Sequence, residues 1–91
     1  MANVIITLRI MPSEAESDIS QIESAVKILV NNFSGNTSAR IEIEPIAFGL
    51  NAIKVMFTVD ENKSLEILEN SIKDIHDIAS VEAIDVRRAI G

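Results

Sequence analysis

Few residues in this chain could carry out catalytic chemistry. The sequence has no cysteine and a single histidine, His76, which sits between Ile75 and Asp77. A helical histidine beside a carboxylate usually belongs to a solvated surface. With one histidine and no cysteine, the chain has almost no residues from which to build a Ser–His or Cys–His catalytic pair. The lack of cysteine also excludes disulfides, thiolate catalysis and cysteine-based metal sites. The residue types therefore argue against an enzyme.

Carboxylates and glycines are present, but without the spacing that a reaction needs. Glu42 and Glu44 alternate along one segment, a pattern that solubility alone produces at the edge of a sheet. The three glycines, Gly35, Gly49 and Gly91, are isolated, and no phosphate-binding Gly-Lys-Ser or Gly-Lys-Thr occurs. We therefore expect no cofactor, no metal and no bound nucleotide, and we expect the chain to act by binding.

One connection departs from the pattern of a buried core. Residues 45–50 are Pro-Ile-Ala-Phe-Gly-Leu, which places Phe48 in a loop that contains a proline and a glycine. An aromatic side chain there either folds back as a lid over one end of the core or stays exposed as an anchor for a partner's pocket. Buried aromatics carry a large share of interface energy. The residues alone leave both interpretations open.

The carboxy-terminal segment is a second candidate contact. Residues 85–91 are Asp-Val-Arg-Arg-Ala-Ile-Gly, with two adjacent arginines in an otherwise acidic chain. Arg87 and Arg88 could pair with carboxylates or phosphates of a partner. They could equally be outward-facing side chains at the end of a strand.

The charge balance favours a protein partner over nucleic acid or membrane. Fourteen acidic and eight basic residues give a formal net charge of −6, and there is no tyrosine or tryptophan. Nucleic-acid binders normally combine a basic surface with stacking aromatics. Acidic charge suits a basic protein partner, although it would also serve solubility alone. No apolar run approaches the roughly 18 residues of a membrane span. The apolar amino terminus lacks a basic region ahead of it, so we expect a first strand, no signal peptide and a cytoplasmic protein.

Hydrophobic periodicity predicts the elements that position these residues. Alternation predicts strands, and apolar spacings of three and four predict helices. The predicted strands span residues 3–11, 39–45, 52–59 and 80–88, and the predicted helices span 18–32 and 65–77. The first strand is apolar on both faces, which indicates a central position, and the second alternates with charge, which indicates an edge. In the last strand we expect Ile84 and Val86 to face the core beside Val81.

The order β-α-β-β-α-β predicts the fold. Crossover handedness favours an α+β ferredoxin-like sandwich, a four-stranded antiparallel sheet with two helices on one face. Residues Arg9, Lys54, Met56 and Thr58 then fall on the sheet face. Apolar residues make up 47% of the chain, enough for one core. We expect a single domain over residues 1–91.

Four segments together carry a resemblance to a known family. They are Met11-Pro12, Glu44-Pro-Ile-Ala-Phe-Gly-Leu50, Ile53-Lys54-Val55 and Val81-Glu-Ala-Ile-Asp-Val-Arg-Arg88. In this order and with these separations, the chain resembles the archaeal translation elongation factor 1-beta family, a family of guanine nucleotide exchange domains. The resemblance covers essentially the whole chain, and the 44–50 string with the Asp-Val-Arg-Arg ending is its most specific part.

The resemblance implies a function and a partner. It implies exchange of GDP for GTP on translation elongation factor 1-alpha. We expect the protein to be monomeric when free. The family's loop aromatic inserts into the G domain of that GTPase, which corresponds to Phe48 here, with Ile46, Ala47 and Gly49 beside it. Eukaryotic members carry the module at the end of a longer subunit and direct a terminal lysine toward the magnesium site. This sequence has no lysine after Lys73, so Arg87 and Arg88 are the basic residues left for that role.

Two other functions fit the fold. A ferredoxin-like regulatory or scaffold module could act by homo-oligomerisation through an edge strand or the sheet face. An acylphosphatase-type enzyme fits less well, because the glycine loop that grips phosphate is missing.

Overall fold

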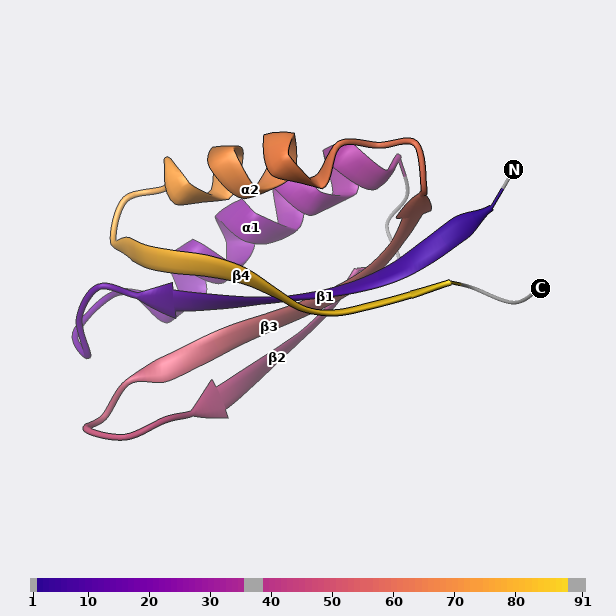
Figure 1. Cartoon of the computed structure of the whole chain (residues 1–91). Helices are drawn as coiled ribbons and strands as arrows, with labels where there is room; N and C mark the ends of the chain where they lie inside the picture. The colour runs from indigo at the N-terminus through magenta and orange to yellow at the C-terminus, as the bar shows by residue number, and fades with distance from the viewer. Residues whose placement is uncertain (1, 36–38, 89–91) are drawn as a thin grey trace.

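The computed structural model describes residues 2–35 and 39–88. Its elements are β1 (Asn3–Pro12), α1 (Ile19–Ser34), β2 (Arg40–Pro45), β3 (Asn51–Asp60), α2 (Leu65–Lys73) and β4 (Ile78–Arg88). The strands form one antiparallel sheet in the order β2-β3-β1-β4, and both helices lie on one face of it (Figure 1). The predicted ferredoxin-like arrangement is confirmed, with β1 central and β2 at an edge. In the described residues, no helix is long and apolar enough to cross a membrane.

The core lies between the helices and the sheet. Side chains alternate between the two faces of a strand, so every second residue of β1 and β3 points toward the helices. Each helix adds one apolar stripe. The core consists of Ile6, Leu8, Ile10, Ile53, Val55, Phe57, Val59, Ile22, Val26, Val30, Leu68, Ile72 and Val81. Phe33 packs edge-on against Phe57 with ring centroids 6.4 Å apart, so two of the chain's three phenylalanines serve the core.

Helix α1 has the predicted Asp18 cap and Gly35 stop, and it ends at Ser34, two residues later than predicted. The Asp18 carboxylate accepts a hydrogen bond from the Gln21 backbone N–H at 3.1 Å, which satisfies one of the free donors at a helix start. At the other end Gly35 has φ 76° and its N–H donates to the Asn31 carbonyl at 2.9 Å. A left-handed glycine is the usual helix stop.

Helix α2 is shorter than predicted. It ends at Lys73, whereas the apolar spacing predicts an end near Asp77. Ile75 continues that spacing and does pack against the core, but it does so from a turn in which its N–H donates to the Ile72 carbonyl. Asp77 then adopts φ 69°, a left-handed conformation that no helix continues through. The helical spacing of apolar side chains therefore continues beyond the last residue of the backbone helix.

Strand β4 contains a bulge at Ile84, a residue whose predicted position is wrong. Its register with β1 shifts between Thr7 and Leu8, which pair with Asp85 and Ala83 and leave Ile84 as the extra residue. An extra residue on one strand reverses the alternation beyond it. Val81 and Ala83 pair with the core residues Ile10 and Leu8 before the bulge, so Ile84 lies on the sheet face opposite the helices, and the prediction that it faces the core is wrong. Beyond the bulge, Asp85 and Arg87 lie on that same face. Val86 pairs with the core residue Ile6 but is exposed.

Candidate functional site

The β2–β3 hairpin ends in a tight turn at residues 46–50. The Ile46 N–H donates to the Leu50 carbonyl at 2.8 Å, and the Leu50 N–H donates to the Ala47 carbonyl at 3.2 Å. The two residues between Ala47 and Leu50 both have positive φ, 61° at Phe48 and 76° at Gly49. Positive φ at both central positions is the pattern of a type I′ turn, whose twist matches that of the flanking strands.

Phe48 is the exposed tip of this hairpin. Its side chain is 96% exposed, so it does not fold back over the core and the lid interpretation is wrong. Ile43 and Ile46 on the same hairpin are also exposed. An aromatic side chain outside the core forgoes about 1.5–3 kcal/mol of burial energy, and the left-handed backbone costs it about 1–2 kcal/mol more. A smaller residue at position 48 would therefore support the fold better than Phe48 does.

One loop lies beside the hairpin turn, and a second loop is hydrogen-bonded to the start of the first. A β-carbon added to Gly49 would lie 3.7 Å from the β-carbon of Ala15, and the Ser13 N–H donates to the Asp77 carbonyl at 2.7 Å. We call residues 13–18, 46–50 and 74–77 the loop end of the molecule. Its acidic residues are Glu14, Glu16, Asp18, Asp74 and Asp77, and it contains no lysine or arginine. The exposed aromatic therefore sits in acidic surroundings.

The two arginines lie at the opposite end of the sheet. Arg87 pairs with Ile5 in the register of β4 with β1, and Ile5 pairs with Thr58 on β3. Thr58 is seven residues along β3 from the strand start that follows the hairpin turn, which corresponds to about 23 Å. The structure therefore does not bring Phe48 and the arginines together (Figure 1). Residues 89–91 of the predicted contact lie outside the described residues.

Both arginines already have acidic neighbours. Arg87 Nε lies 2.8 Å from Asp85 Oδ2, and Arg88 Nη2 lies 3.3 Å from Glu61 Oε2. The arginine side chains are about three-quarters exposed in each pair. Exposed ion pairs of this kind contribute only about 0–1 kcal/mol. The arginines could therefore exchange these carboxylates for those of a partner at small cost.

His76 is on a solvated surface, as predicted. Its side chain is almost fully exposed, and Nε2 lies 3.3 Å from Asp77 Oδ1. Within residues 2–35 and 39–88, no group of three histidine, aspartate or glutamate side chains is placed to hold a metal ion.

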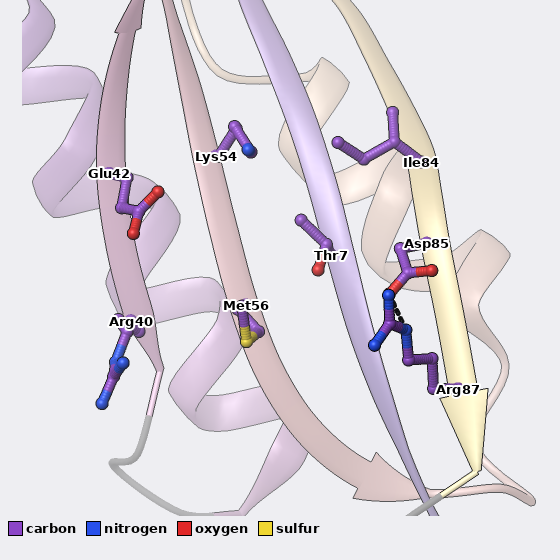
Figure 2. Close-up of a pocket in the computed structure, with 8 residues that line it drawn as sticks. All are labelled: Thr7, Arg40, Glu42, Lys54, Met56, Ile84, Asp85 and Arg87. Atoms are coloured by element: carbon purple, nitrogen blue, oxygen red, sulfur yellow. Dashed lines mark ion pairs between the residues drawn. The ribbon is translucent and has the colours of Figure 1, made fainter.

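The sheet face opposite the helices, which we call the open face, holds a hollow that the sequence did not reveal. Its volume is about 340 Å³, and it is lined by Thr7, Arg40, Glu42, Lys54, Met56, Ile84, Asp85 and Arg87. Figure 2 shows these side chains projecting from all four strands. Thr7 is only 7% exposed, whereas Met56 and Ile84 are 42% and 40% exposed. Lys54 and Met56 lie on the sheet face as predicted, and Ile84 lies there with them instead of in the core.

Comparison with known proteins yields one family. Residues 5–89 match the family model described as the EF-1 guanine nucleotide exchange domain. Similar curated proteins carry the name elongation factor 1-beta. The one from Methanosphaera stadtmanae is 36% identical over 89 residues, covering 97% of this chain and 98% of its own. Those from Methanobrevibacter smithii and Pyrococcus abyssi are 34% and 31% identical, covering 97% and 94% of this chain and 98% and 94% of their own.

Proposed function

The chain belongs to the EF-1 guanine nucleotide exchange domain family, and on that premise we propose that it accelerates exchange of GDP for GTP on elongation factor 1-alpha during polypeptide elongation. The observation that carries this proposal is the family match over residues 5–89. The relatives are also similar along nearly their whole length. Membership of this family does not favour the alternative of an oligomeric regulatory module.

We place the main contact at the hairpin turn, with Phe48 as the anchor and Ile46, Ala47 and Gly49 shaping the turn around it. The full exposure of Phe48 and its left-handed backbone support this assignment. Because the aromatic ring is already outside the core, inserting it into a partner's pocket breaks no contact within the core. Aromatic anchors of this kind commonly contribute 2 kcal/mol or more to binding.

Exchange by binding needs no titrating residue. An exchange factor must bind the nucleotide-free GTPase more tightly than the nucleotide-bound one. Linkage is reciprocal, so the factor weakens nucleotide binding by the same free energy by which the nucleotide weakens the factor's binding. Contacts to Mg²⁺ and the switch segments help hold the phosphates of a GTPase. A wedge such as Phe48 that disturbs them would raise the rate of GDP release.

The remaining expectations complete the proposal. Arg87 and Arg88 supply a secondary contact, in which carboxylates of the partner replace Asp85 and Glu61. Residues 1–91 act as one cytoplasmic domain that is monomeric when free. It makes no direct contact with nucleic acid and catalyses no covalent step. The acidic loop end around Phe48 suits a pocket with a basic rim.

Release of a fluorescent GDP analogue from elongation factor 1-alpha tests the function directly. The GTPase is loaded with the analogue and chased with excess unlabelled GDP, with and without substoichiometric amounts of this protein. We expect faster release with the wild-type chain, and release close to the unassisted rate with the Phe48→Ala variant at unchanged thermal stability. No acceleration by the wild-type chain, with a GTPase shown to be active, would refute the proposal.

A further inference from the structure

The hairpin tip is too small to bind a GTPase by itself. A phenylalanine side chain buries about 150–250 Å², whereas a stable interface buries about 800 Å² on each partner. Ile46 and the rest of the turn add only part of the missing buried area. If the turn is the anchor, a larger surface continuous with it must supply the rest.

The open face is continuous with the hairpin. The tip belongs to β2 and β3, and the same two strands supply Arg40, Glu42, Lys54 and Met56 to the hollow. In Figure 1 the helices lie above the sheet, and the end of the β2–β3 hairpin lies at the lower left, on the side away from the helices. A partner that receives Phe48 from that side therefore approaches the open face, while the helices face away from it.

Apolar side chains occupy the middle of the open face. Met56 projects beside the nearly buried Thr7 (Figure 2). Ile84, the extra residue at the β4 bulge, lines the same hollow. Bulges often serve to re-aim a side chain, and this one turns Asp85 and Arg87 onto the open face beside Ile84, where regular alternation from Val81 would have placed them toward the helices. An apolar centre within a charged surround is the usual anatomy of a protein interface.

The charges around this centre are mixed in sign. The open face carries Arg9, Arg40, Lys54 and Arg87 together with Glu42, Glu44, Glu82 and Asp85. Glu44 lies 3.7 Å from Lys54 and 4.0 Å from Arg9. By contrast, Arg40, Glu42 and Glu82 make no ion pair with any described residue. A complementary partner surface thus places a carboxylate opposite Arg40 and basic groups opposite the two glutamates.

We propose that the open face, centred on Met56 and Ile84, is the second part of the surface that binds elongation factor 1-alpha, continuous with the Phe48 anchor. The inference rests on the proposed exchange function and adds to it the face that the GTPase covers. It places Thr7, Met56 and Ile84 inside the complex and leaves helices α1 and α2 in solvent.

Lysine substitutions on the two faces test this. Met56→Lys and Ile84→Lys place a charge in the proposed interface, whereas Ile28→Lys and Ile67→Lys place it on the helices, where the native side chains are 62% and 64% exposed. We expect the open-face variants to raise the Kd for the nucleotide-free GTPase about tenfold or more, as loss of a central contact does. The helix variants should stay within about twofold of wild type. Thermal unfolding checks that all four variants fold, as expected for exposed positions where a lysine stem can lie along the surface.

Cysteine protection gives a second measurement without a buried charge. The chain has no cysteine, so Met56→Cys and the control Ile67→Cys each carry one thiol whose alkylation can be followed on its own peptide by mass spectrometry. We expect excess nucleotide-free GTPase to protect the Met56→Cys thiol and to leave the Ile67→Cys thiol reactive.

The outcomes separate this inference from the function on which it rests. If the wild-type chain accelerates GDP release and Phe48→Ala does not, but Met56→Cys stays reactive in the complex, the open face is solvent-exposed and the inference is wrong while the exchange function stands. Equal loss of binding in open-face and helix variants would also overturn it. If the wild-type chain neither binds the GTPase nor accelerates release, both proposals fail.

Discussion

At the scale of single residues, Phe48 lowers the stability of the fold that carries it. A residue with φ near 60° is strained unless it is glycine, or asparagine or aspartate, whose short side chains tolerate that conformation. Phe48 has φ 61° and is 96% exposed, so it has neither the backbone freedom of glycine nor the contacts of a core residue. Strain of this kind tends to occur where binding requires it.

Phe48→Asn separates stability from function at this position. Asparagine is a favoured residue in type I′ turns, so we expect the free energy of unfolding to rise by about 0.5–1 kcal/mol. Acceleration of GDP release should fall, because the aromatic anchor is gone. Urea denaturation and the GDP-release assay measure the two effects. A loss of stability in this variant would mean that the ring makes contacts that hold the fold together.

The two glycines with positive φ form a matched pair. Gly35 and Gly49 both have φ 76°, and an added β-carbon meets nothing within 4 Å at Gly35 and only Ala15 at 3.7 Å at Gly49. Because neither site is crowded, alanine should lower the free energy of unfolding by about 1 kcal/mol at each, through the backbone alone. Only Gly49→Ala should also reduce the acceleration of GDP release from the GTPase. If the Gly35→Ala and Gly49→Ala variants accelerated GDP release equally well, the backbone shape of the hairpin turn would not matter for exchange.

At the scale of elements, the sequence predicted those parts of the fold that local interactions determine. The Asp18 cap and the Gly35 stop of α1 are recognisable without knowing anything about the rest of the chain. The end of α2 was placed too late because Ile75 keeps the helical spacing in a turn. The Ile84 bulge was missed because a register shift depends on which strand β4 pairs with, and alternation along one strand does not contain that information.

The caps of the two helices should differ in their contribution to stability. The Asp18 side chain accepts a hydrogen bond from the Gln21 N–H, whereas the Ser64 side chain makes no capping hydrogen bond to the described turn that follows it. Asp18→Ala should therefore lower the free energy of unfolding by about 1 kcal/mol, and Ser64→Ala by clearly less. Chemical denaturation of both variants measures the difference. Equal losses would show that the hydrogen bond between the Gln21 N–H and the Asp18 side chain has no energetic effect in solution.

At the scale of the whole molecule, the candidate contacts with the GTPase are spread along the sheet and do not cluster in one place. The sequence placed Phe48 in a hairpin connection and the arginines on the last strand, but their distance depends on the strand order. That order, β2-β3-β1-β4, puts the hairpin turn and Arg87 at opposite ends of a sheet in a molecule that is 42 Å long. A GTPase that touches both must span most of that length.

This separation predicts how two variants combine. Residues more than about 10 Å apart with no shared partner contribute additively to binding, within about 0.5 kcal/mol. The start of β3, directly after the Phe48 turn, lies about 23 Å along the strand from Thr58, which is in register with Arg87 through Ile5. The ion pair of Arg87 is with Asp85 on its own strand. The loss of binding free energy in the double variant Phe48→Ala, Arg87→Ala should therefore equal the sum of the two single losses, measured as Kd for the nucleotide-free GTPase. A coupling energy above about 1 kcal/mol would mean that the two ends of the sheet act through one conformational change in the partner, since Phe48 and Arg87 share no contact among residues 2–35 and 39–88.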